Sequence, residues 1–447
     1  MMMKKTKLFL GLFLILSVTM LNAQPKDEFK PEVKIGGVIY TYWDYNVDNA
    51  NFISKLDTSS AGSNYAFGFK PTNRQFEVSQ NSFQVERAYI NVLASLAPNI
   101  KGRVTPDVYS FTDGSGNTQF ALRLKYAFVD WTAFKEDNGL SLDFTMGIEP
   151  NRWIAMAERY WGYRGFQKTL TDYTFTTAAS KSGNLIKRST GSYFSSADLG
   201  LEGNLNLPKG FGELYLNVFN GNGYGNLSYD NRFKDFMGSL FIHPLANMLA
   251  KKTKASKTGR VDGIADLTLG GFAYLGKLAT GENTTVASDG NVYTQTVRNR
   301  FGGMLSLKYN FKQAGFVKIG GEFSLQSNQD PASSKPDSVA KTTASGLSVY
   351  LEFNPPVKSL NEKLMLVARY DMFDPNTANE SASTTSFNDN TDKQSLLILG
   401  LAYKPSKVMT LGVTYQAVTY QSEYVVKFDG TTSKTDALLR IHGILEF

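Results

Sequence analysis

Hydrophobic and polar residues alternate with a period of two along much of this chain. In the segment 436–447, one set of alternate positions is apolar, whereas the other set contains Arg440, His442 and Glu446. Successive side chains of a strand point to opposite faces, and a helix would mix the two sets. The pattern therefore predicts a β-strand that has one apolar face.

The same alternation occurs in about sixteen segments, each long enough to cross a bilayer as a tilted strand. The faces are least clear in 80–96 and 232–243, because Arg87 and Lys234 interrupt the alternation. The segments lie at 33–45, 80–96, 100–110, 119–133, 140–150, 197–206, 211–219, 232–243, 265–276, 297–310, 315–326, 345–354, 362–373, 395–404, 407–419 and 436–447. This even number predicts an all-β fold, a 16-stranded antiparallel transmembrane β-barrel, with 14 or 18 strands and a secreted β-sandwich or β-helix as alternatives.

The connections between these segments alternate between short and long. The short ones are built on Pro, Gly and Asn, and lie near 97–99, 135–139, 207–210, 312–315, 354–356 and 404–406. The long ones include 46–79, 151–196, 277–296, 327–344, 374–394 and 420–435. Short periplasmic turns and long outer loops are typical of outer-membrane barrels. The basic insert 244–264 is the exception, and a miscounted hairpin is most to be expected there.

Aromatic residues support the same arrangement. The chain has 31 Phe, 23 Tyr and 4 Trp residues, and aromatic rings end every second predicted strand. The rings at these ends are Trp131, Phe134, Tyr309, Phe311, Phe353, Tyr403 and Phe447. Such a pattern is typical of the aromatic girdles that lie at a membrane–water interface.

The remaining composition excludes several kinds of chemistry. The chain has no cysteine, which excludes disulfides, thiolate metal sites and cysteine nucleophiles. No grouping of His, Asp and Glu predicts a metal centre, and nothing predicts a cofactor. A net charge of +7, of which three units lie in the N-terminal 23 residues, does not indicate nucleic-acid binding. His442 faces the predicted lumen, but no nucleophile is paired with it in the sequence.

The first 23 residues have the features of a secretory signal peptide. Lys4, Lys5 and Lys7 precede a short apolar run, and Ala23 offers a small residue at the cleavage point. The run is too short to remain as a transmembrane helix. We therefore expect a signal peptide at 1–23 and a single exported barrel domain at 24–447, integral to the outer membrane.

Several motifs are dispersed over nearly the whole mature chain. They are the terminal Phe447, Val218–Gly223, Phe236–Pro244, Gly147–Pro150 before a long loop, and Arg369–Asp371 before Asp374 and Pro375. Together they resemble bacterial outer-membrane porins, most closely the phosphate-selective porin O and P family. The resemblance implies a 16-stranded barrel, usually a homotrimer, that passes small anions, with Phe447 as a signal for the barrel assembly machinery. The chain departs from that family in having no dense Arg/Lys ladder.

The longest connection, 151–196, occupies the place of the third outer loop, which folds inward and narrows the pore in 16-stranded porins. Its first half is rich in bulky aromatic residues, which suits packing against the inner wall better than exposure to water. Charge rings at such constrictions set ion selectivity. We therefore predict an anion-favouring constriction formed by Arg152, Arg159, Arg164 and Lys168, with an ordinary outward loop as the alternative.

Inward-facing strand positions carry a second set of charges. The main basic candidates for the lumen wall are Arg123, Lys125, Arg298, Arg300 and Arg369. Inward acidic residues nearly cancel the inward basic ones, which is typical of a solvated and cross-paired lining. We therefore expect selectivity to come from the loop rather than from the wall.

These features predict a non-enzymatic, water-filled porin for passive diffusion of small hydrophilic solutes and ions, with an anion preference. The expected partners are small anions or hydrophilic solutes, outer-membrane lipid and lipopolysaccharide, the assembly machinery and further copies of the chain. A substrate-specific channel for sugars or hydrophobic compounds is the alternative, and a line of aromatic residues along the lumen would favour sugars. A barrel enzyme or adhesin is a more distant alternative. The basic run 251–260 is either a solvated periplasmic turn or a contact for an acidic partner.

Overall fold

The structure is a computed structural model of the chain. It describes residues 29–47, 51–52, 80–112, 118–173, 176–181, 184–189, 194–225, 234–256, 260–280, 294–331, 339–374, 377, 393–421, 425–427, 429 and 431–447. The predicted signal peptide and large parts of several predicted outer loops lie outside the described residues. None of the helices in the described part is long and apolar enough to cross a membrane.

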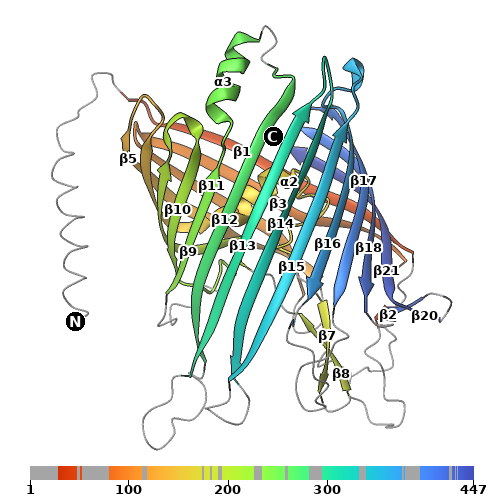
Figure 1. Ribbon diagram of the computed structural model, residues 1–447. Coiled ribbons are helices and arrows are strands. Elements are labelled where there is room, and N and C mark those ends of the chain that lie inside the picture. Colours follow the sequence, from red (N-terminus) through yellow and green to blue (C-terminus); the bar gives the residue numbers. More distant parts are fainter. Residues whose placement is uncertain are drawn as a thin grey trace, which may run out of the picture.

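Sixteen strands form a closed antiparallel barrel, as the alternation predicts (Figure 1). In chain order they are β1 (Glu32–Asn46), β3 (Asn81–Ala97), β4 (Ile100–Thr112), β5 (Thr118–Lys135), β6 (Ser141–Pro150), β9 (Ala197–Asn206), β10 (Gly212–Phe219), β11 (Asp235–Ile242), β12 (Gly263–Thr280), β13 (Thr294–Asn310), β14 (Phe316–Pro331), β15 (Val339–Asn354), β16 (Leu364–Asp374), β17 (Gln394–Ser406), β18 (Met409–Tyr420) and β21 (Thr435–Glu446). Each pairs with the next along the chain, and β21 pairs with β1. Two small sheets lie outside the barrel order: β2 (Asn51–Phe52) with β19 (Val425–Val426) and β20 (Thr432–Ser433), and β7 (Thr176–Lys181) with β8 (Asn184–Ser189).

Two local features explain why the faces of two segments are unclear in the sequence. Between β1 and β3, the pairing steps from Tyr40–Arg87 to Thr41–Val85, so that Glu86 is skipped. Such a bulge shifts the alternation by one residue, which places Arg87 on the inner face. The second case is simpler, because β11 begins at Asp235 and Lys234 precedes it.

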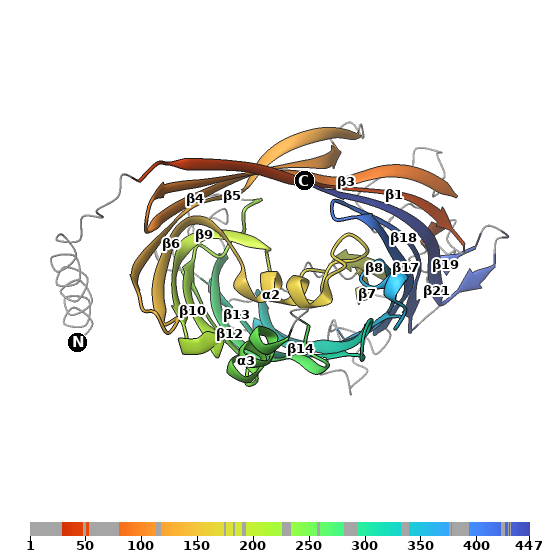
Figure 2. The same cartoon turned by 90° about the horizontal axis from the view of Figure 1, so that it is seen from above.

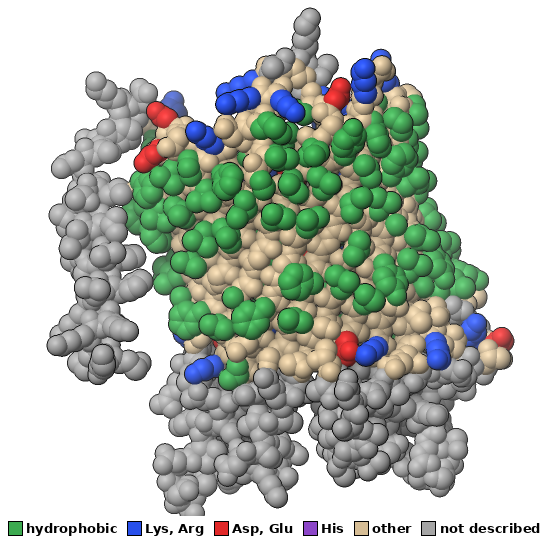
Figure 3. Space-filling model, in the orientation of Figure 1, with side chains coloured by type: hydrophobic (Ala, Val, Ile, Leu, Met, Phe, Trp, Pro, Cys, Tyr) green, Lys and Arg blue, Asp and Glu red, His purple; other side chains and the backbone are tan. Residues whose placement is uncertain are grey.

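The outer face of the wall is apolar and the inner face is largely polar. On β14, Phe323 is 50% exposed and Leu325 is 51% exposed, whereas Ser324 between them is 1% exposed. Figure 3 shows apolar side chains spread over the outer wall, with charged side chains gathered at its two edges. This is the distribution expected of a barrel that lies in lipid and has a polar interior.

Aromatic rings gather where the girdle is predicted. The ring of Tyr309 lies 6.2 Å from that of Phe311, which lies 6.0 Å from that of Phe353. Elsewhere on the same rim, on β5 and β6, Trp131 stacks on Phe144 with the centroids 5.8 Å apart. These residues lie at the end of the barrel that carries the short turns.

The connection 244–264, which departs from the alternation of short and long, contains a helix and adds no hairpin. Helix α3 (Ala246–Ala255) projects from the barrel at the end where the short turns lie (Figure 1). Ala, Leu, Met and Lys dominate its sequence, and these residues favour helix formation. Lys251, Lys252 and Lys254 are exposed. The strand count is therefore unaffected.

Main-chain hydrogen bonds between the first and last strands close the barrel. Beyond the β1–β21 ladder, the Gly37 amide donates to the Phe447 carbonyl at 2.7 Å, and the Phe447 amide donates to the Gly37 carbonyl at 3.0 Å. A side chain on Gly37 would collide with the ring of Phe447, because its Cβ would lie 2.6 Å from that ring. The Phe447 side chain is 64% exposed on the outer surface.

The connection lengths predict the orientation of the barrel. After single-cysteine substitution, Ser334→Cys and Asn379→Cys should react with a membrane-impermeant thiol reagent on intact cells. Pro208→Cys and Pro405→Cys should react only after the outer membrane is permeabilised. The absence of native cysteine removes background labelling. Labelling of Pro405→Cys on intact cells would show that the assigned orientation is wrong.

Charging the terminal ring should impair assembly. Phe447→Asp places a carboxylate on the membrane-facing surface beside the closing strand pair, where an ionised side chain is unfavourable. We expect a several-fold lower amount of heat-modifiable protein in the outer membrane, whereas Phe447→Tyr should assemble normally. Equal amounts of the Asp variant and the native protein would remove Phe447 as an assembly signal.

Candidate pore constriction

Residues 151–173 turn from the end of β6 into the barrel interior and begin with helix α2 (Arg152–Trp161), which crosses the interior (Figure 2). The Asn151 side chain caps the helix by accepting from the amides of Trp153 and Ile154, at 3.1 and 3.3 Å. Gly162 ends the helix with φ 76°, a left-handed conformation that glycine adopts without strain. This first half of the predicted inward loop therefore lies inside the barrel.

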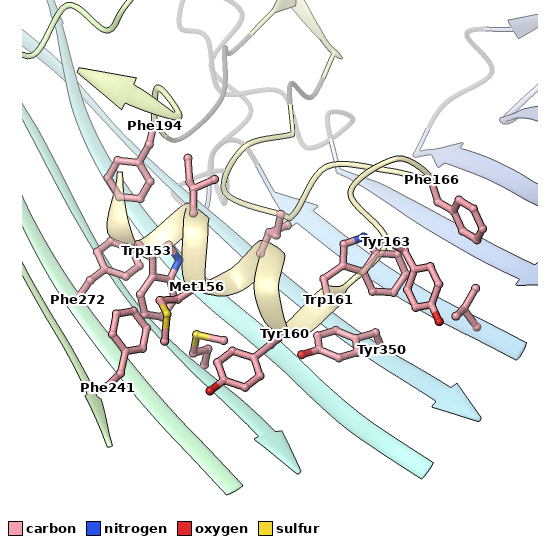
Figure 4. Packing of buried hydrophobic residues seen from close by; sticks show 14 of the residues in the cluster. Trp153, Met156, Tyr160, Trp161, Tyr163, Phe166, Phe194, Phe241, Phe272 and Tyr350 are labelled. Atoms are coloured by element: carbon pink, nitrogen blue, oxygen red, sulfur yellow. The ribbon is translucent and has the colours of Figure 1, made fainter. Parts of the chain in front are cut away.

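The apolar side of α2 packs against inward-facing aromatic residues of the wall (Figure 4). The ring of Trp153 lies 4.4 Å from that of Phe272 and 5.7 Å from that of Phe241. Further along, Trp161 lies 5.5 Å from Tyr350. A cavity of about 10 Å³ lies between Trp161 and β13–β16, which is room for about one water molecule. The helix is thus closely packed against this side of the wall.

Buried polar groups fix the same segment to the wall. The carboxylate of Glu322 on β14 accepts from the Leu170 amide at 2.7 Å and from the Trp153 indole at 3.3 Å. Arg369 on β16 donates to the Lys168 carbonyl at 2.7 Å while it pairs with Asp371. Two of these bonds satisfy main-chain groups, the Leu170 amide and the Lys168 carbonyl, in a segment that is not paired with a strand.

Beyond α2, the segment reaches the part of the wall where β21 pairs with β18 on one side and with β1 on the other, and β3 follows β1. Phe166 stacks on His442 at 4.5 Å, and its carbonyl accepts from Gln416 at 3.0 Å. Arg164 then pairs with Glu86 of β3 at 3.1 Å. The segment therefore touches the wall at both β14 and β3, and it spans the interior between them.

The predicted basic residues of the loop lie in the interior, but three of the four are paired with carboxylates. Arg152 pairs with Glu202 at 2.6 Å, Arg164 pairs with Glu86 and with Glu158, and Lys168 lies 3.9 Å from Asp172. Arg159 is exposed and lies over the ring of Tyr160. Glu202 and Glu86 lie outside the loop, so a charge count over the loop does not include them, whereas Glu158 and Asp172 belong to the loop itself.

Burial affects the protonation of this segment. It raises the pKa of the Glu158 carboxyl, and Arg164 at 3.0 Å opposes this shift. Burial also lowers the pKa of the Lys168 ammonium, which Asp172 partly offsets. Both shifts have the direction that desolvation imposes on a charged group.

The opposite side of the interior, formed by β3, β4 and β5, carries a group of cations. Arg87 and Arg123 both bind Asp107, at 2.8 and 2.9 Å, and both donate to the hydroxyl of Tyr224. The side chains of Arg87 and Arg123 are 16% and 25% exposed, although they point into the barrel. Two partly exposed cations thus share one carboxylate inside the barrel.

Two further cations continue this group. Lys125 donates to the Tyr89 hydroxyl at 3.0 Å, and the charge of Glu158 on α2 acts on it from the loop. Arg103 lies 4.4 Å from the ring of Tyr126 and donates to Asn91 at 2.8 Å. We call Arg87, Arg103, Arg123 and Lys125 the wall cations.

The other predicted wall residues also face the interior, and they differ in how they are bound. Arg298 pairs with Asp235 at 2.9 Å. Arg300 lies over the rings of Phe194 and Tyr274, at 5.4 and 5.1 Å. These residues help to hold the structure of the interior, as does the Arg369 contact described above.

Sequence reasoning missed two of the four wall cations. Arg87 was obscured by the bulge that skips Glu86. Arg103 could have been found, because Val104 beside it is 45% exposed on the outer face and the period of two then places Arg103 inside.

The two histidines belong to structural contacts. His442 is 1% exposed and hydrogen-bonds Thr414 at 2.9 Å beneath Phe166. His243 lies between Thr268 and Glu213, at 2.9 and 3.0 Å. Within the described residues, no group of three or more His, Asp or Glu side chains is arranged to hold a metal ion.

No protein-family model and no curated protein sequence matches the chain. Among solved structures, the outer membrane channel DcaP of Acinetobacter baumannii is similar with a TM-score of 0.50 and 11% identity, over 95% of this chain and 100% of that chain. OprB of Pseudomonas putida is similar with a TM-score of 0.51 and 9% identity, over 93% of this chain and 94% of that chain. Identities this low show a common fold, and they do not single out the phosphate-selective family. The chain therefore has the barrel fold of an outer-membrane channel.

Proposed function

We propose that this protein is an outer-membrane porin through which small hydrophilic solutes and ions diffuse passively, with a preference for anions. The closed barrel has an apolar exterior and a polar interior, and it resembles a known outer-membrane channel in fold. The segment 151–173 crosses the interior and packs against β11–β16. Solutes would therefore pass on the side of this segment that faces β4 and β5.

The observation that carries the anion preference is the imbalance of charge on β3–β5. Arg87 and Arg123 share Asp107, and neither Lys125 nor Arg103 has a carboxylate within ion-pair distance among the described residues. Two further acids lie on the same wall: Glu86 is paired with Arg164 of the loop, and Asp130 accepts from Thr145 and acts on Arg103. The four wall cations therefore face Asp107 and Asp130. A cation about 4 Å from a passing anion contributes roughly 4 kcal/mol at an effective dielectric of 20, before desolvation and screening.

This proposal moves the main selectivity from the loop to the wall. Arg152, Arg164 and Lys168 remain candidate contacts for anions, but each has a nearby carboxylate that offsets its charge. Arg159 is the exposed member of the predicted set. A specific phosphate channel has no separate support, so the proposal stays with small anions in general.

A sugar-selective channel is the second candidate. Tyr40, Tyr42, Tyr89, Tyr109 and Tyr126 line β1 and β3–β5 on the inner side, which is the aromatic row that would favour sugars. Several of these rings are covered by cations, for example Tyr42 by Arg440 at 3.8 Å. Covered rings are less available for stacking on a sugar, so we rank this function second. Block of the ionic current by neutral sugars would favour it.

The remaining expectations belong to the same proposal. We propose export by the 1–23 signal peptide, insertion by the assembly machinery through Phe447, and a homotrimer in contact with outer-membrane lipid and lipopolysaccharide. We propose no catalytic activity, metal or cofactor.

Neutralising the wall cations should reduce the anion preference. Arg87→Gln combined with Lys125→Gln removes two charges while Arg123 still pairs with Asp107. In a planar bilayer with a salt gradient, the reversal potential should move toward cation preference. The shift should be largest below about 0.1 M salt, where the screening length exceeds about 10 Å. Lys312→Gln, in an exposed turn, is the control. An unchanged reversal potential in the double variant would exclude these residues as the selectivity determinant.

Releasing the constriction segment should change the conductance. Glu322→Leu leaves the Leu170 amide and the Trp153 indole without their acceptor, at a cost of about 1–3 kcal/mol for each buried donor. We expect single-channel currents that are larger or that fluctuate between levels, with unchanged heat-modifiability. Glu446→Gln, at an exposed strand end, should behave like the native protein. Native-like currents in the Leu variant would show that this carboxylate does not hold the segment in the pore.

A further inference from the structure

Residues 220–224, which follow β10, bring one tyrosine to the wall cations. The Tyr224 hydroxyl accepts from Nη1 of Arg87 at 3.1 Å and from Nη2 of Arg123 at 2.8 Å. These arginines belong to β3 and β5, and they lie 137 and 101 residues earlier in the chain. Tyr224 therefore joins two wall cations through an atom that belongs to neither of their strands.

The loop that carries Tyr224 is held firmly to the start of β9. The buried carboxylate of Asp198 accepts from the amides of Gly221 and Gly223, at 3.0 and 3.1 Å, and the Tyr224 amide donates to the Ala197 carbonyl at 3.0 Å. The two glycines have φ 82° and 71°, a left-handed conformation that glycine adopts without strain. The glycine motif at the end of β10 thus forms a fixed loop that places the phenol.

The Arg123 guanidinium lies between two aromatic rings. Its central carbon is 4.0 Å from the ring centroid of Tyr109 and 4.5 Å from that of Tyr224. Its Nε donates to Asp107 at 2.9 Å, and Nη1 of Arg87 donates to the same carboxylate oxygen at 2.8 Å. Within the described residues, Nη1 of Arg123 and Nη2 of Arg87 donate to no protein group, so these donors are available to a solute anion.

The phenol is a neutral acceptor, and this property determines the charge of the group. Asp107 balances only one of the two guanidinium charges. The Tyr224 hydroxyl accepts from both arginines without cancelling the remaining charge. A carboxylate in the same place would accept from the same donors but would leave the group without net charge. A phenol therefore holds two like charges together and preserves their attraction for an anion.

The same surroundings favour ionisation of the phenol. Burial raises the pKa of Tyr224, but the charges of Arg87, Lys125 and Arg123 and the hydrogen bond from Arg87 lower it, and the net shift is downward from the usual value for tyrosine. The charged and titratable groups around Tyr224 and its two arginines come from three strands: Arg87 and Tyr89 on β3, Asp107 and Tyr109 on β4, and Arg123 and Lys125 on β5.

We propose that Tyr224 is a specificity-determining residue of this channel, which holds Arg87 and Arg123 together at neutral pH without cancelling their charge and cancels it once the phenol ionises. This inference rests on the proposed function, because it concerns the charge that a permeating anion meets. Ionisation releases the phenol proton to water and leaves a phenolate beside the two arginines and Asp107, a group with no net charge. The contribution to anion preference is therefore present below the pKa of Tyr224 and is lost as the pH rises through it.

The test measures the reversal potential of the channel in a planar bilayer with a salt gradient, at about pH 7.5 and at about pH 9.5, a range over which ordinary tyrosine and lysine side chains mostly keep their neutral-pH forms. In the native protein, the anion-to-cation permeability ratio should fall about twofold, which is the effect of one unit charge about 7 Å from an ion in water. Tyr224→Phe should show no such fall. A purely structural role of Tyr224 would change the size of the current but not its dependence on pH.

Two further variants separate the phenol from its setting. Tyr309→Phe removes a phenol from the membrane-facing surface and should retain the native pH dependence. Asp198→Ala releases the loop and should lose the pH dependence although Tyr224 is still present, whereas Asp429→Ala, at an exposed carboxylate of another connection, should not. Heat-modifiability reports that every variant is folded.

An equal fall of the permeability ratio in the native protein and in Tyr224→Phe would overturn this inference, while the anion preference at neutral pH, and with it the proposed function, would stand. A native-like pH dependence in Asp198→Ala would overturn the loop as the element that positions the phenol. Cation preference of the native protein at neutral pH would contradict the proposed function, and the difference between the pH dependences of the native protein and Tyr224→Phe would still decide the role of Tyr224.

Discussion

The structure depends on the closure of one hydrogen-bonded sheet. In a bilayer, every main-chain amide and carbonyl must find its partner within the protein, which for strands requires a barrel without free edges. The chain meets this requirement through fifteen sequential antiparallel pairings and the final pairing of β21 with β1, completed by Gly37 and Phe447. Closure also separates the two faces of every strand, so the period of two becomes an apolar exterior and a polar interior.

The closed wall then provides the surface on which the constriction forms. Exposure of a helix with a row of aromatic residues to water would be unfavourable. Here the helix packs on the inward-facing residues Phe241, Phe272 and Tyr350. The wall also supplies the buried acceptor Glu322 and the donor Arg369 to the same segment. These contacts lie on β11–β16, whereas Arg87 and Arg123 lie across the interior on β3 and β5, where the segment meets the wall through the Arg164–Glu86 ion pair.

Much of the fold could be predicted from the sequence, because the alternation is a local property of each strand. The position of α2 in the interior was suggested by its aromatic residues, whose exposure to water would be unfavourable. The pairing of the loop cations could not be predicted, since Arg152 meets Glu202 and Arg164 meets Glu86 through the fold alone. Arg87 was hidden by a bulge that breaks the period. Helix α3 was missed because a basic insert without strand pattern was interpreted as a turn.

The central claim is that the interior is an open, anion-preferring path beside the wall cations. The most direct test is the reversal potential of the native protein in a planar bilayer that separates two concentrations of potassium chloride. The account predicts discrete channel openings and a reversal potential with the sign of chloride preference, which weakens as the salt concentration rises. Cation preference at low salt, or the absence of conductance from correctly folded protein, would contradict it.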